Sequence, residues 1–183
     1  MSESTLWTLS IAAVTGGTAV LASWVTSRGS TRAARIQAET AAETQRRERL
    51  RESRRTAYLE LIEQAHRMGE LFWEVSDVLR QPAADADTAA LQRLSERQTA
   101  EYATLRRCVR VVELEGPRPA AEAALVVQKS TRAFHAAIQQ ALHAGADPDD
   151  WEAAEQRFDA AYSPFWRALE AFVDTAREAH QGP

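Results

Sequence analysis

The chain has 183 residues, of which 45% are hydrophobic and 26% are charged, a balance that excludes a disordered protein and allows one domain with a real core. Its formal net charge of −4 is unevenly distributed, because residues 1–55 hold nine Arg and five Glu, whereas residues 56–183 hold thirteen basic and twenty-one acidic residues. The acidic part argues against a nucleic-acid-binding domain, so we expect no direct nucleic-acid binding. The single cysteine, Cys108, excludes an internal disulfide.

The chain begins with a long uncharged run. Residues 4–27 are 24 residues without a charge, and as a helix they would measure about 36 Å, enough to cross a hydrocarbon core of about 30 Å. Trp7 and Trp24 stand near the two ends, where aromatic rings prefer the level of the lipid headgroups. The sequence therefore predicts a single transmembrane anchor at residues 1–27.

Arginines follow this run at once, at Arg28, Arg32 and Arg35. Because positive residues stay on the cytoplasmic side of a span, we expect a single-pass protein of the cell membrane, with its N-terminus outside and its C-terminus in the cytoplasm. The three side chains are predicted to lie at the membrane surface, where anionic lipid attracts each of them by about 1 kcal/mol.

Other interpretations of the run stay open. Val20-Leu21-Ala22 resembles the cleavage site of a secretory signal peptide, although the positive residues that should precede such a signal are missing. The run could also be a buried helix of a soluble protein. Small residues four apart, such as Ala12 and Gly16, would let two spans approach closely, although such residues are common in membrane spans anyway.

Residues 28–55 are predicted to be a basic juxtamembrane helical stalk. They are mainly Arg, Glu, Gln, Ala and Thr, and Ile36 and Leu50 are their only large aliphatic residues. Such a stretch can bury little, so it should be a solvated helix, or a weak coiled coil if the chain oligomerises. We therefore expect self-association to occur through the anchor or the stalk.

Residues 56–183 are predicted to form an antiparallel up-down four-helix bundle, which makes the fold all-α. Apolar residues recur at steps of three and four, and Pro or Gly interrupts the pattern three times. Asp147 is suited to cap the last helix, whereas Pro164 should kink that helix or split it. The expected helices end near Leu79 and then cover about 88–114, 119–144 and 148–179.

The sequence offers little chemistry. Glu63 and His66 form half of a di-iron motif, but the other histidines lack a Glu three residues earlier. Common nucleotide-binding and hydrolase motifs are absent as well. We therefore expect no enzymatic activity, no metal site and no cofactor.

Two aromatic pairs, Phe72-Trp73 and Phe165-Trp166, are candidates for a partner surface. Neighbours on a helix point in different directions, so one member of each pair should face outward or sideways unless the core is wide enough to hold both. Because Trp is enriched at interface hot spots, Trp73 and Trp166 are the candidate partner-binding residues.

The whole layout resembles a known group of proteins. It combines LWTLSIAAVTGGTAVLASWV at 6–25, SRGSTRAAR at 27–35, a helical stalk and VELEGP at 112–117. It resembles the KilB-type membrane proteins of streptomycete conjugative plasmids, and one Lys beside twenty-one Arg is typical of high-GC actinobacterial coding. The resemblance implies a part in conjugation and plasmid spread within the mycelium, through contacts with other membrane or transfer proteins. The alternative is a membrane-anchored adaptor or scaffold unrelated to mobile DNA.

Overall fold

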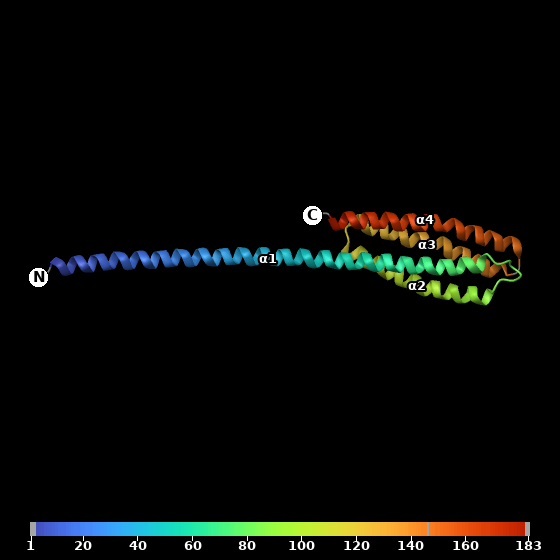
Figure 1. Cartoon of the computed structure of the whole chain (residues 1–183), viewed down its shortest axis with the longest axis horizontal. Helices are drawn as coiled ribbons and strands as arrows, with labels where there is room; N and C mark the ends of the chain where they lie inside the picture. The colour runs from blue at the N-terminus through green and yellow to red at the C-terminus, as the bar shows by residue number, and fades with distance from the viewer. Residues whose placement is uncertain (1–2, 146, 182–183) are drawn as a thin grey trace. The chain divides into compact units, whose positions relative to one another are not determined.

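All regular secondary structure in the part of the chain that the structure describes is α-helical (Figure 1). The structure is a computed structural model, which describes the backbone of residues 3–145 and 147–181 and the side chains of residues 35–145 and 147–181. The chain divides into two compact units, residues 1–49 and 50–183. Its helices are α1 (Glu3–Leu79), α2 (Thr88–Glu115), α3 (Arg118–Ala144) and α4 (Pro148–Gln181).

The all-α prediction is confirmed, and consecutive helices make antiparallel contacts within a helical bundle. The predicted anchor at 1–27, together with Arg28 and Arg32, lies outside the residues whose side chains are described. In the described part of the chain, no helix is both long enough and apolar enough to span a membrane.

The connections between helices follow the turn residues of the sequence. Asp87 caps α2, because its Oδ1 accepts a hydrogen bond of 2.8 Å from the amide of Ala90. Gly116 ends α2, and Gly145 ends α3 with a φ of 60°, a value that glycine adopts without strain. Asp147 caps α4 through a 3.0 Å bond to the amide of Asp149, so the predicted cap is confirmed.

Of the two outcomes predicted for Pro164, a kink or a split of the last helix, the split is wrong, because α4 continues through the proline from Pro148 to Gln181. The kink stays a prediction. Pro164 itself is exposed, whereas Phe158 and Ala161 before it and Phe165 after it are buried. A proline inside a helix costs about 3 kcal/mol. Burial of the same helix face on both sides of the proline offsets this cost and keeps the helix in one piece.

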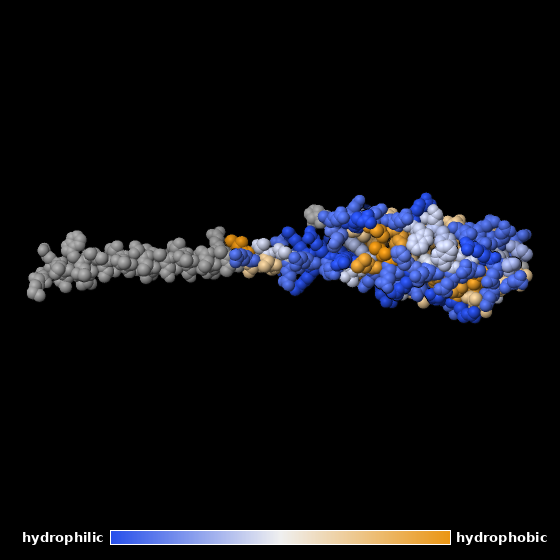
Figure 2. Space-filling model, viewed as in Figure 1, coloured by the Kyte–Doolittle hydropathy of each residue, from blue (hydrophilic) through white to orange (hydrophobic). Residues whose placement is uncertain are grey.

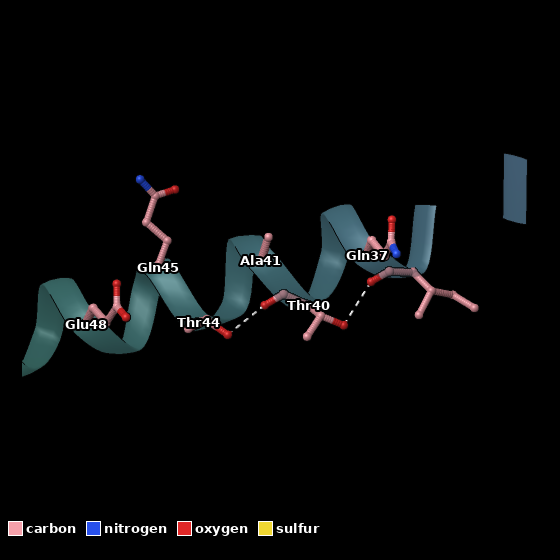
Figure 3. Close-up of a pocket in the computed structure, with 7 residues that line it drawn as sticks. Gln37, Thr40, Ala41, Thr44, Gln45 and Glu48 are labelled. Atoms are coloured by element: carbon pink, nitrogen blue, oxygen red, sulfur yellow. Dashed lines mark hydrogen bonds between the residues drawn. The ribbon is translucent and has the colours of Figure 1, made fainter. Parts of the chain in front are cut away.

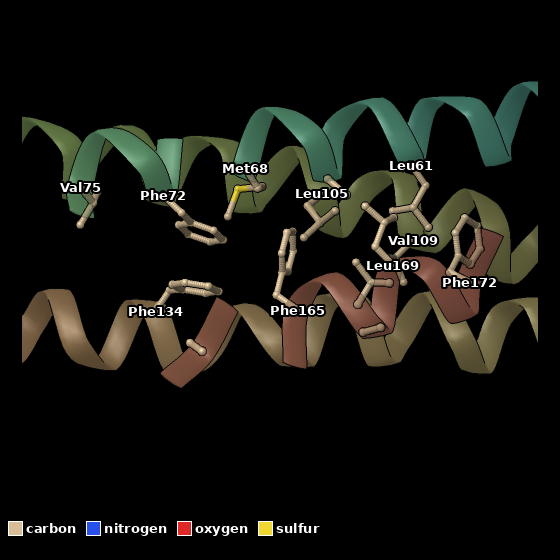
Figure 4. Close-up of a cluster of buried hydrophobic side chains, with 14 of the residues drawn as sticks. Leu61, Met68, Phe72, Val75, Leu105, Val109, Phe134, Phe165, Leu169 and Phe172 are labelled. Carbon is tan, nitrogen blue, oxygen red and sulfur yellow. The ribbon is translucent and has the colours of Figure 1, made fainter. Parts of the chain in front are cut away.

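The bundle core is built from aromatic rings. All five phenylalanines are fully buried. Phe72 of α1 and Phe134 of α3 stack with ring centroids 3.7 Å apart, and Phe165 of α4 meets Phe72 edge-on at 5.5 Å (Figure 4). Such stacked and edge-to-face pairs add about 0.5–1.5 kcal/mol each to the burial of their area. The cluster therefore ties α1, α3 and α4 together.

Polar side chains close the two ends of the bundle. Trp151 of α4 donates its indole N–H to the carbonyl oxygen of Leu79, at 2.8 Å, and so satisfies a carbonyl at the end of α1. Arg54 of α1 donates to the carbonyl oxygen of Glu115, the last residue of α2, at 2.8 Å. These bonds fix where the helix ends lie within the bundle.

Candidate partner-binding surface

Trp73 is a large aromatic residue that the bundle leaves exposed. Its side chain lies on α1 and is 56% exposed, whereas its neighbour Phe72 is completely buried. Successive residues of a helix are turned by about 100°, so the core that takes Phe72 cannot take Trp73 as well. Most of the bundle surface in Figure 2 is hydrophilic, with smaller apolar areas between. Because Trp is enriched at interface hot spots, the exposed ring of Trp73 is the candidate contact for another protein.

Tyr162 of α4 supports the indole of Trp73. The two rings are tilted by 53°, with centroids 5.8 Å apart. The Tyr162 hydroxyl is buried beside the side chain of Ser76. Burial disfavours the phenolate and raises the pKa of Tyr162 to about 12. Tyr162 therefore stays neutral to a higher pH than a free tyrosine, and its ring packs against the indole of Trp73.

Trp166 is only half-buried and lies over a glycine. A methyl group at Gly69 of α1 would lie 2.7 Å from Cζ2 of Trp166, so the indole occupies the space that a larger residue would fill. His66 flanks the same indole, with ring centroids 5.7 Å apart, and Phe165 meets it edge-on at 5.2 Å. Trp166 thus packs sideways across α1, whereas Trp73 faces outward. Trp73 is therefore the more exposed of the two candidate partner-binding residues.

The charges beside Trp73 are mainly negative. Glu70 and Asp77 precede and follow it by three and four residues on α1, and both are exposed. Asp159 of α4 and Asp77 raise the pKa of Tyr162 whereas Arg80 lowers it, so two carboxylates and one guanidinium lie close to the supporting ring. Glu74 instead pairs with Arg97 of α2 at 2.7 Å. The surface around Trp73 is thus suited to a partner with basic side chains.

The stalk exposes its side chains to solvent wherever they are described. Residues 35–53 are all exposed, including Ile36, and Arg35 pairs with Glu39 at 2.9 Å. Thr40 and Thr44 donate their hydroxyls to the carbonyl oxygens one turn earlier on α1, at 2.9 and 3.0 Å (Figure 3). Surface ion pairs of this kind are worth only about 0.3–0.5 kcal/mol each.

Glu63 and His66 are engaged in other contacts. Glu63 pairs with Arg67 one turn later, and Nδ1 of His66 lies 2.8 Å from the carbonyl oxygen of Ile62. Within the part of the chain that the structure describes, no three His, Cys, Asp or Glu side chains gather as a metal ion would require. Cys108 packs at the edge of the core, where burial raises the pKa of its thiol. A raised pKa lowers the reactivity of a thiol at neutral pH.

The sequence pattern missed two residues of this surface, Tyr162 and Gly69. Gly69 did leave a signal, because a glycine inside an apolar helical pattern often marks a close approach of another group. Comparisons of the chain with protein-family models, curated proteins and solved structures found no match.

Proposed function

We propose that this chain is a single-pass membrane protein without enzymatic activity, which acts through contacts between its cytoplasmic helical bundle and another protein. The uncharged run at 4–27 and the arginines Arg28, Arg32 and Arg35 support the anchor and its orientation. The observation that carries the binding role is Trp73, which is 56% exposed above a bundle whose phenylalanines are all buried. The acidic side chains beside it favour a basic partner segment.

The setting that we propose is conjugative plasmid transfer and spread within the mycelium. The support is the resemblance in layout to the KilB-type proteins of streptomycete conjugative plasmids. In this proposal the anchor holds the protein at the membrane or cross-wall, the basic stalk lies beside the anionic lipid surface, and the bundle recruits other membrane or transfer proteins. Self-association through anchor or stalk would place several bundles together and raise the avidity of a weak contact.

The first experiment is imaging of a C-terminal green-fluorescent fusion in living hyphae. We expect a membrane outline with foci at cross-walls. Diffuse fluorescence would contradict the anchor, whereas an even outline would favour an adaptor unrelated to mobile DNA.

The binding role is tested by replacing Trp73 in that fusion. Trp73→Ala should abolish the foci and reduce plasmid spread while the membrane outline remains, because it removes the hot spot and not the anchor. Leu114→Ala is the matched control, since Leu114 is 84% exposed on α2 and lies outside the proposed surface. Equal behaviour of the two variants would overturn the role of Trp73.

A further inference from the structure

Helices α2 and α3 meet along a polar seam, which we define by the hydrogen-bonded pairs Gln98–His135 and Ser95–Gln139. Nδ1 of His135 lies 3.0 Å from Oε1 of Gln98, and Nε2 of Gln139 donates to Oγ of Ser95 at 3.1 Å. Gln98 and Ser95 are only 2% and 5% exposed. Their partners lie nearer the surface, since His135 is exposed and Gln139 is half-buried. A buried polar group that is hydrogen-bonded favours one arrangement of its partner, so the seam helps to fix the register of the two helices.

A pocket of about 280 Å³ opens beside this seam. Each helix contributes three residues to the pocket, at positions i, i+1 and i+4. The residues of α2 form one wall of the pocket and those of α3 form the opposite wall. The ring of Tyr102 and the methyl groups of two threonines give the pocket apolar surface, and a guanidinium and an imidazole give it polar surface. The lining residues are Gln98, Thr99 and Tyr102 of α2, and Thr131, Arg132 and His135 of α3.

The charge of this pocket is opposite to that of the bundle. Residues 56–183 carry thirteen basic and twenty-one acidic residues, yet residues 123–144 of α3 contain Lys129 and Arg132 and not one Asp or Glu. Glu101, which precedes Tyr102, is directed to α1, because its Oε2 accepts a hydrogen bond of 2.6 Å from Gln64. Among the side chains that the structure describes, Arg132 forms no ion pair.

Two lining side chains keep hydrogen-bonding capacity for a ligand. The Tyr102 hydroxyl accepts a bond of 2.9 Å from Nε2 of Gln128, so its own hydrogen can be donated. Gln98 uses its amide oxygen towards His135, so its amide nitrogen is the part that could donate to a ligand. The pocket thus combines one cation and several donors with apolar walls, and no carboxylate lines it.

We propose that this pocket binds a small organic carboxylate with an apolar body. A guanidinium binds a carboxylate through two parallel hydrogen bonds, which is the role that we assign to Arg132. The apolar walls then take the rest of the molecule. The volume lies just below the range of about 300–1,000 Å³ for drug-sized ligands, so the ligand is about the size of a substituted benzoate. This inference is independent of the proposed partner surface, because α2 and α3 form the pocket, whereas α1 carries Trp73 and α4 carries Tyr162.

The test is NMR of the full-length chain labelled in its four histidines, which lie at positions 66, 135, 143 and 180. Titration with benzoate should shift the imidazole signals of His135 in a saturable way and leave those of His66 and His180 unchanged. Benzyl alcohol, which has the same ring without the charge, and inorganic phosphate, which has the charge without the ring, should each cause a smaller shift. An equal response to either would overturn the proposal, as would the lack of a saturable shift with benzoate.

A pair of matched variants tests whether Arg132 contacts the carboxylate of the ligand. Arg132→Ala should weaken benzoate binding at least about tenfold, because it removes a charge-assisted bond, whereas Lys129→Ala should change it less than about twofold. Both residues are exposed cations on α3, but only Arg132 lines the pocket. Tyr102→Phe should also weaken binding, by about fivefold, through loss of one donor. Equal effects of Arg132→Ala and Lys129→Ala would show general charge attraction and overturn the proposed site.

Discussion

At the scale of single residues, the contact between Gly69 and Trp166 decides how closely α1 and α4 approach. Glycine inside a helix costs about 1 kcal/mol relative to alanine. Glycine at this position leaves room for the indole of Trp166. A methyl group on residue 69 would lie only 2.7 Å from Cζ2 of that indole. The cost of the glycine is offset by the partial burial of the Trp166 side chain, which stabilises the fold. The glycine is thus explained by its neighbour and not by its own helix.

This contact predicts a change of sign in a double-mutant cycle. Gly69→Ala alone should lower the free energy of unfolding by about 1 kcal/mol, because the overlap with Trp166 exceeds the gain in helix propensity. In a Trp166→Ala background the same change should raise it by about 1 kcal/mol. Urea denaturation of the four proteins measures both steps. The same sign in both backgrounds would show that Trp166 does not restrict position 69.

Tyr162 predicts how stability depends on pH in the alkaline range. Its pKa is about 12 in the folded protein and close to 10 in the unfolded chain. Between these values the unfolded chain loses the proton while the folded protein keeps it, so the free energy of unfolding falls as pH rises from about 10 to about 12. Tyr162→Phe should make this fall less steep. Denaturation at about pH 9 and about pH 11 measures the difference, and an unchanged slope in the variant would contradict the role of burial.

At the scale of whole helices, α4 continues through Pro164 at a cost that a substitution should reveal. Pro164 is exposed, so Pro164→Ala removes no core contact and restores a backbone N–H. We expect the free energy of unfolding to rise by about 1–3 kcal/mol. Ser163→Ala, a change of the exposed neighbour, should stay within about 0.5 kcal/mol. A destabilising effect of Pro164→Ala would mean that the core requires the local geometry that proline imposes.

The helices themselves could be predicted because local chemistry sets their ends. Gly116 and Gly145 and the capping residue Asp147 lie where the structure ends or begins a helix, within about two residues of the predicted bounds. The predicted split at Pro164 is wrong, because the local effect of the proline competed with burial of the helix face on both sides of it. Tertiary packing overrides propensity where the buried area is large.

The neighbours across helices could not be predicted in the same way. Gln98 interrupts the apolar pattern of its helix, yet it is 2% exposed and bonded to His135 of the next helix. The pairing of Trp73 with Tyr162 likewise depends on the register between α1 and α4. The apolar periodicity of a sequence predicts the helix face on which a residue lies, but it does not predict which residue of another helix it contacts. Only the packed bundle supplies that information.

At the scale of the whole molecule, the distribution of charge separates the two parts of the chain. Residues 1–55 carry a net charge of +4, from nine Arg and five Glu, and residues 56–183 carry −8, from thirteen basic and twenty-one acidic residues. An anionic membrane surface would attract the first part and repel the second, within a screening length of about 8–10 Å. In the proposed function this asymmetry keeps the bundle surface free of lipid, so that Trp73 remains open to a partner.

The proposed anchor predicts the result of placing one charge in the uncharged run. Val14→Arg should release the protein from the membrane, because an Arg at the centre of a span costs about 2.5–3.5 kcal/mol on insertion scales. Val126→Arg is the matched control, since Val126 is 52% exposed on α3 and tolerates a charge. Flotation of membranes from cells that express each variant measures the bound fraction. If Val14→Arg floats as well as Val126→Arg, residues 1–27 are not the anchor; if the native protein is recovered with a new N-terminus after Ala22, the run is a cleaved signal and the bundle lies outside the cell.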